Sequence, residues 1–132
     1  MLFRSRENVD AAFYWAGLEG VQRFAFQLYR NPDGSEHGFG DRALPCKSNA
    51  ADRLAAFAAL RGDGALTIVL VNKDLDRPAE VLLDAVDNKI RKSGGVIFRL
   101  PNPPGPIRKE SLAADVTRIV VPPLSAALIV RP

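Results

Sequence analysis

The residues best able to do chemistry gather in one short stretch, QLYRNPDGSEHGFGD, at positions 27–41. It holds Asp33, Glu36 and Asp41, together with His37, the only histidine of the chain. Three carboxylates could supply oxygen ligands to Ca²⁺, and a histidine beside a carboxylate could act as a general base. However, the spacing does not fit an EF-hand loop, because the bidentate glutamate of the twelfth position is missing. No nucleophile with its expected neighbours accompanies His37, so we favour a structural role for the stretch.

We interpret this stretch as a helix exit and a joint between two structural layers. The pair Asp33-Gly34 predicts a turn, and Gly38 and Gly40 would let the backbone approach a neighbouring layer closely. The lone cysteine, Cys46, excludes an internal disulfide and a cysteine-based zinc cluster, and we expect a buried or idle thiol. We therefore assign no catalytic, cofactor-binding or metal-binding residue from the sequence.

Composition limits the class of protein. The chain has 132 residues, of which 47% are hydrophobic and 25% charged, which suits one soluble domain with a real core. The net charge is +3, but the arginines are scattered from Arg4 to Arg131, so we expect no nucleic-acid partner. No stretch approaches the ~18 apolar residues of a membrane span, so we expect no membrane partner. The first ten residues lack the apolar core of a signal peptide, which leaves the compartment open.

Helical patterns dominate the first part of the chain, which holds eight of the ten aromatic residues within positions 1–39. Residues 7–16 and 18–30 each predict a helix. On the second helix one face carries Val21, Phe24, Ala25 and Leu28 at helical spacing. Asn31-Pro32 then predicts the end of the helix.

Later segments read as short strands separated by turn residues. They cover residues 65–73, 78–86, 94–100, 117–122 and 124–132. Apolar and β-branched residues, short length and spacing of roughly ten residues predict an antiparallel sandwich or barrel.

Residues 49–61 give conflicting signals. Their alanine content favours a helix, whereas Asp63-Gly64 directly afterwards favours a hairpin turn. We predict a strand from residue 54 that pairs with the next one around a type I′ turn. In that register Phe57 and Ile68 are expected among the buried positions.

Two motifs together resemble a known family. They are FAFQLYRNPDGSEHGFGD (24–41) and LAAFAALRGDGALTIVLVNKDLDRPAEVLLD (54–84). They are similar to the C-terminal end of glycoside hydrolase family 44 and related endoglucanase-like proteins, where the last barrel helix leads into an all-β sandwich. The resemblance covers residues 10–130.

The resemblance implies a mainly β fold, an antiparallel β-sandwich of about seven to eight strands preceded by one or two N-terminal α-helices. We expect residues 1–41 to form the helical segment and joint loop, and residues 42–132 to form the sandwich, packed together as one unit. Members of the family are usually secreted. Whether the chain is a separate product or part of a longer one stays open.

The resemblance implies no active-site residue in this chain. Family members place their catalytic carboxylates at the strand ends of a barrel, and the region that this chain resembles includes almost none of that barrel. We therefore expect a non-catalytic accessory domain with a structural or interaction role. A carbohydrate-binding module is one alternative, although Phe57 and Phe98 of the sandwich fit core positions. A piece of a polysaccharide hydrolase, or a small hydrolase in its own right, is another.

Aromatic residues of the helical part suggest where a partner would bind. The helices carry apolar side chains on more than one side, so one sandwich cannot cover them all. We expect a homodimer or a separate catalytic subunit to contact them, with a polysaccharide as a further candidate ligand. The predicted interaction surface consists of Phe13, Tyr14, Trp15, Phe24, Phe26 and Tyr29.

Overall fold

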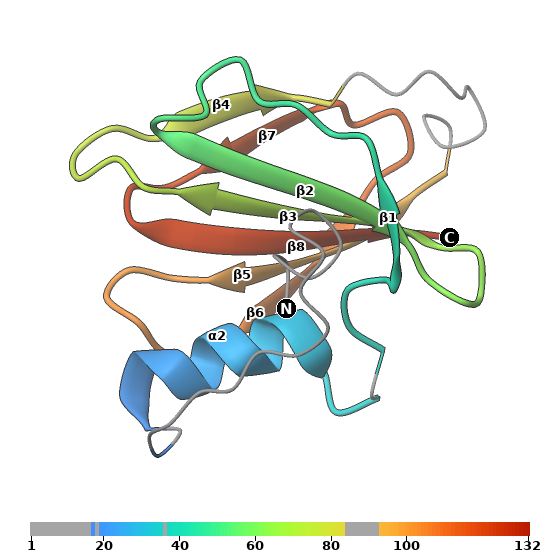
Figure 1. The fold of residues 1–132 in the computed structure, drawn as a ribbon, viewed down its shortest axis with the longest axis horizontal. Helices are drawn as coiled ribbons and strands as arrows, with labels where there is room; N and C mark the ends of the chain where they lie inside the picture. Colours follow the sequence, from blue (N-terminus) through green and yellow to red (C-terminus); the bar gives the residue numbers. More distant parts are fainter. Residues whose placement is uncertain (1–16, 18, 36, 84–92) are drawn as a thin grey trace.

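The computed structural model describes residues 17, 19–35, 37–83 and 93–132 (Figure 1). Its elements are helix α2 (Gly20–Arg30) and strands β1 (Arg42–Leu44), β2 (Leu54–Leu60), β3 (Leu66–Asn72), β4 (Ala79–Leu82), β5 (Gly95–Leu100), β6 (Arg108–Leu112), β7 (Arg118–Val121) and β8 (Ser125–Arg131). The predicted fold class, a mainly β antiparallel sandwich after a helix, is confirmed. The helix predicted over residues 7–16 lies outside the described residues.

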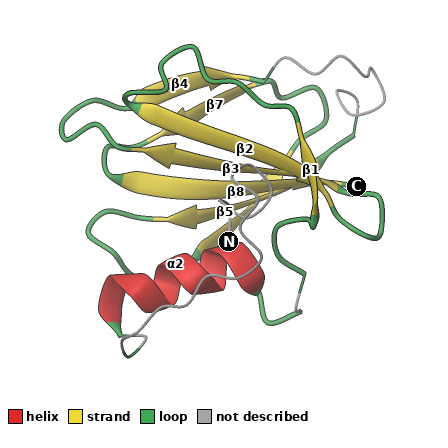
Figure 2. Ribbon diagram, in the orientation of Figure 1, coloured by secondary structure: helices red, strands yellow, loops and turns green. Residues whose placement is uncertain are grey.

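The strands form two antiparallel sheets, one of six strands and one of two. The large sheet has the order β1-β2-β3-β8-β5-β6, and the small sheet pairs β4 with β7. In Figure 2 strands β2, β3, β8 and β5 of the large sheet lie one below another, with β4 and β7 above them and α2 below them. The molecule is therefore layered as small sheet, large sheet and helix.

Apolar side chains cover both faces of the large sheet, because its central strands β3 and β8 are apolar at successive positions. One core lies under the small sheet, where Leu70, Ile97 and Ile129 meet Val121 of β7. The second core lies on the opposite face under α2. It consists of Leu28, Ala65, Val69, Phe98, Leu100, Leu128 and Val130.

Strands β2 and β3 form the predicted hairpin, so residues 54–60 are a strand in spite of their alanine content. The predicted type I′ turn is wrong. Gly64 has a φ of 88°, but Asp63 is not among the residues with positive φ. Arg61 and Ala65 close a three-residue loop, since Arg61 N–H donates to Ala65 O at 2.9 Å and Gly64 N–H donates to Arg61 O at 2.9 Å. Such a loop needs only its last residue in the left-handed region.

Several other sequence predictions need correction. Phe57 and Ile68 are half-buried instead of buried. On α2, Leu28 is buried and Phe24 packs on the sheet, but Val21 and Ala25 of the predicted stripe are exposed. The helix therefore contacts the sheet through a narrower face than the periodicity predicts.

Candidate interaction site at helix α2 and the joint loop

Helix α2 divides the predicted interaction surface into two sets. Phe24 and Tyr29 pack toward the second core, and the Tyr29 ring lies 5.2 Å from the Phe39 ring. Burial raises the pKa of the Tyr29 hydroxyl. On the opposite side of the helix, two residues before Leu28, Phe26 is 39% exposed. The outward face of α2, defined here by Phe26, is thus the described part of this surface that is exposed to solvent.

The remaining members of that surface, Phe13, Tyr14 and Trp15, lie outside the described residues. Their role in binding stays a prediction. Glu36 of the joint loop also lies outside the described residues, so its contribution to a metal site is untested.

The joint loop lies tightly against its neighbours, as its glycines predicted. A Cβ added at Gly38 would overlap the carbonyl oxygens of Tyr29 and Arg30, and one at Gly40 would overlap the Leu60 carbonyl group. Both obstacles are backbone atoms, which cannot rotate away. The joint loop therefore requires glycine at both positions.

Hydrogen bonds fix the loop at both ends. Phe39 N–H donates to Tyr29 O at 2.8 Å, which closes the turn after α2. Asp33 accepts hydrogen bonds from the backbone N–H (3.1 Å) and the hydroxyl of Ser35. Lys109 Nζ of β6 donates to the same carboxylate at 3.2 Å and lies 5.5 Å from the centre of the Phe98 ring. The loop is thereby attached to the edge of the large sheet.

Three carboxylates among the described residues accept hydrogen bonds that lower their pKa. The Ser35 hydroxyl is the main cause of the lowered pKa of Asp33. The Arg61 guanidinium lowers the pKa of Asp63 to about 2. The backbone N–H groups of Asp76 and Arg77 lower the pKa of Asp74. A general acid needs a raised pKa, so these three carboxylates are shifted in the direction opposite to the one that proton donation requires.

A second polar cluster joins the two sheets at the exit of β3. Asn72 is buried, and its Nδ2 lies 2.9 Å from Arg77 O, 3.0 Å from Val121 O and 3.1 Å from Pro122 O. Its Oδ1 accepts from Asp74 N–H at 3.0 Å. The Asn72 side chain therefore ties the end of β3 to the small sheet.

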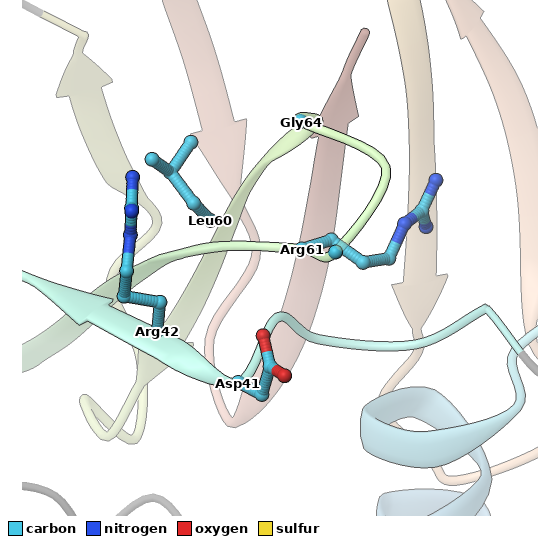
Figure 3. A pocket seen from close by; sticks show the side chains of 6 residues that line it. Asp41, Arg42, Leu60, Arg61 and Gly64 are labelled. Carbon is cyan, nitrogen blue, oxygen red and sulfur yellow. The ribbon is translucent and has the colours of Figure 1, made fainter.

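A shallow pocket of about 260 Å³ lies at the other end of the large sheet, beside the β2–β3 turn (Figure 3). Asp41, Arg42 and Leu60 line it together with Arg61 and two turn glycines. The Arg61 guanidinium is engaged, since Nη2 lies 2.7 Å from Asp63 Oδ2 and Nη1 donates to His37 O at 3.4 Å. We assign this pocket no ligand.

The residues weighed as metal ligands do not come together in the described part of the chain, where no group of three or more His, Cys, Asp or Glu could hold an ion. Cys46 is exposed, which excludes the first of the two expectations, a buried thiol, and leaves the second, an idle one, although partial desolvation still raises its pKa. A raised pKa makes a thiol a poor nucleophile. None of the helices that the structure describes has the length and apolar character needed to cross a membrane.

Sequence reasoning missed the polar residues that organise the fold: Thr67, Asn72 and Arg99. Each makes a hydrogen bond to a residue between 21 and 50 positions away. The local sequence does not reveal the partners of such residues. It does mark Thr67 as a polar residue within an apolar strand, which indicates a buried side chain that needs hydrogen-bond partners.

Comparisons with known proteins identify relatives for this arrangement. No family model matches the chain. Endoglucanase A of Paenibacillus lautus is 27% identical over 93 residues, which cover 67% of this chain and 13% of that protein.

Solved structures give broader matches. A family 44 xyloglucanase from Paenibacillus polymyxa matches 98% of this chain with a TM-score of 0.85 and 25% identity. CelM2, a bifunctional glucanase-xylanase from a metagenome library, matches 96% with a TM-score of 0.77 and 30% identity. The family 44 endoglucanase Cel44A of Clostridium thermocellum matches 84% with a TM-score of 0.75 and 25% identity. The chain spans 27%, 25% and 23% of these three proteins. The resemblance to family 44 enzymes is thus confirmed, for about a quarter of their length.

Proposed function

Because this chain shares its sandwich with a quarter-length part of family 44 glycoside hydrolases, we propose that it is a non-catalytic accessory domain of that kind. Its role is to bind and brace a family 44-type catalytic domain. The observation that carries the proposal is the match of 98% of this chain to 27% of the Paenibacillus polymyxa xyloglucanase at a TM-score of 0.85. The catalytic domain would be supplied by the other part of such an enzyme.

The chemistry of the described carboxylates supports a non-catalytic role. Asp33, Asp63 and Asp74 have lowered pKa values and partners that hold them ionised. Glu80 pairs with Arg118 at 2.7 Å, and Glu110 pairs with Arg99 at 2.9 Å. Glycoside hydrolysis needs one carboxyl group with a raised pKa beside an ionised one. These five groups serve the fold instead.

The outward face of α2 is the surface that we propose for docking. Its inner face already packs on the large sheet through Leu28, so the helix has one apolar side in use and another in solvent. Burying one Phe side chain contributes roughly 1.5–3 kcal/mol, so Phe26 serves as the centre of the proposed contact. A homodimer through the same face is the competing arrangement.

A carbohydrate-binding module is less well supported. Sugar-binding surfaces present aromatic faces, yet Phe98 is buried in the second core and Phe57 is half-buried on the sheet. The exposed aromatic ring of Phe26 fits a protein contact equally well.

A binding experiment tests the proposal. The chain is co-expressed with the catalytic domain of the Paenibacillus polymyxa xyloglucanase, deprived of its own matching region, and complexes are measured by light scattering after gel filtration. We expect a one-to-one complex that Phe26→Asp abolishes. The control is Leu82→Asp on the small sheet, where Leu82 is 67% exposed, and this variant should bind like the parent.

The absence of a complex, or equal loss in both variants, would contradict docking through α2. A doubled mass of the chain alone, lost in Phe26→Asp, would support the homodimer instead.

A further inference from the structure

Strand β7 has an open edge. In the described part of the chain it pairs with β4, and no second strand lies beside it. Leu83 N–H donates to Thr117 O at 2.7 Å, which marks that pair as hydrogen-bonded. Because bonded and non-bonded pairs alternate in an antiparallel ladder, Ile119 and Val121 point their backbone groups toward β4. Arg118 and Val120 therefore point theirs toward the open edge.

A side chain from the other sheet reaches this edge. Arg99 of β5 donates from Nη1 to the carbonyl oxygen of Val120 at 2.9 Å. Its Nε donates to Glu110 Oε2 of the neighbouring strand β6, also at 2.9 Å. The guanidinium is thus anchored on the large sheet, and it occupies the acceptor that the N–H of an added strand would use.

We infer that Arg99 prevents the open edge of β7 from pairing with a strand of a second copy of this chain. An open edge offers unpaired backbone groups to any other strand, and proteins protect such edges with charged side chains, proline or short length. The large sheet follows this rule, since β1 has three residues and is followed by Pro45, and β6 exposes Arg108 and Lys109. At β7 the protection comes from Arg99.

The residues around β7 would favour pairing with an added strand if the Arg99 side chain were removed. Val120 is 49% exposed, and Leu82 on the same outer face is 67% exposed. An added strand would therefore gain apolar contacts on this face as well as backbone hydrogen bonds. The alternative is that Arg99 only ties the two sheets together, in which case its loss lowers stability without changing association.

Analytical ultracentrifugation across a concentration series separates these two roles. We expect the weight-average mass of Arg99→Ala to rise with concentration more steeply than that of the parent chain. The matched control is Arg118→Ala, which removes an exposed ion pair with Glu80 from the same strand and leaves the Val120 carbonyl bonded to Arg99. It should behave like the parent.

A rescue variant tests whether β7 is the edge involved. Proline at position 120 removes a backbone N–H that makes no bond to β4, which an edge strand tolerates. The double variant Arg99→Ala/Val120→Pro should return to the mass profile of the parent. If Arg99→Ala does not fold, Glu110→Gln, which loosens the anchor but keeps Arg99, should show a weaker rise in mass.

The inference is overturned if Arg99→Ala, or Glu110→Gln in its place, has the mass profile of the parent at every concentration. It is also overturned if Val120→Pro leaves the added association unchanged. A lower melting temperature alone would assign Arg99 to the tie between sheets.

Discussion

Gly40 donates its backbone N–H to the hydroxyl oxygen of Thr67 at 2.9 Å, and that hydroxyl donates in turn to Ala59 O at 2.9 Å. Thr67 is fully buried in the central strand β3. One side chain thus satisfies the joint loop and strand β2 at once. The loop that the sequence marked as a candidate for chemistry is held by the core of the sandwich.

Replacing Thr67 with valine should destabilise the fold by about 1–3 kcal/mol, because the near-isosteric change removes the hydroxyl that accepts from the buried Gly40 N–H. Urea unfolding monitored by circular dichroism measures the loss. Thr67→Ser keeps the hydroxyl and should retain more stability than Thr67→Val. A neutral Thr67→Val with a destabilised Thr67→Ser would show that the methyl group, not the hydrogen bonds, matters.

Alanine at Gly38 should destabilise the chain by roughly 1–3 kcal/mol, because the new methyl group would overlap the backbone carbonyls of Tyr29 and Arg30. Alanine at Gly62 is the control, since no atom lies within 4 Å of the added carbon. We expect its effect to stay within about 0.5 kcal/mol. Thermal unfolding of both variants checks the comparison, and a neutral Gly38→Ala would refute the tight joint.

Asn72→Asp should be strongly destabilising at neutral pH, because the change replaces a donor with a carboxylate oxygen beside the carbonyls of Arg77, Val121 and Pro122. The cost should exceed the ~1 kcal/mol typical of a lost hydrogen bond. Since a protonated carboxyl group can donate, the deficit should shrink at acidic pH. Urea unfolding at neutral and acidic pH measures it, and a deficit independent of pH would argue against this account.

Asp63 predicts a pH dependence of stability. Its folded pKa is about 2, below the ordinary value of 3.8, chiefly because Arg61 donates hydrogen bonds to it. A lowered carboxylate pKa stabilises the folded state above the unfolded pKa, and the effect is lost as the pH falls through about 2. The stability difference between the parent and Asp63→Asn should therefore be constant at neutral pH and vanish near pH 2.

The size of that difference should be small, because the Asp63 side chain is half exposed and salt screens the pair. A difference that persists at pH 2 would contradict the assignment.

Local sequence patterns predicted the apolar strands and the exit of the helix, because burial on both faces and turn residues leave a strong local signal. They left β1 and β6 unassigned. Arg42–Leu44 is too short for a period to show, and Arg108–Leu112 is polar because it forms an exposed edge. The β2–β3 turn was placed correctly but given the wrong type, since Asp63-Gly64 matches the signal of a two-residue loop, whereas Arg61 and Ala65 close a loop of three residues that also includes Gly62.

The contacts that join the layers were beyond local prediction. Arg99 reads from the sequence only as the outward residue of an apolar strand, and its bond to Val120 spans 21 positions. Asn72 appears in the sequence only as a polar residue at the end of an apolar strand, yet its Nδ2 donates a hydrogen bond to Val121 O of β7. Such side chains gain their role from which strands the topology brings together, and periodicity carries no information about that.

We propose that this chain supports a hydrolase domain and has no hydrolase activity of its own. The most direct test of the second point measures the release of reducing ends from polysaccharides. The purified chain is incubated with carboxymethylcellulose, xyloglucan and xylan. We expect no release above that from a heat-denatured sample. Activity that survives repurification and disappears when one carboxylate of this chain, such as Asp41, is replaced by its amide would contradict it.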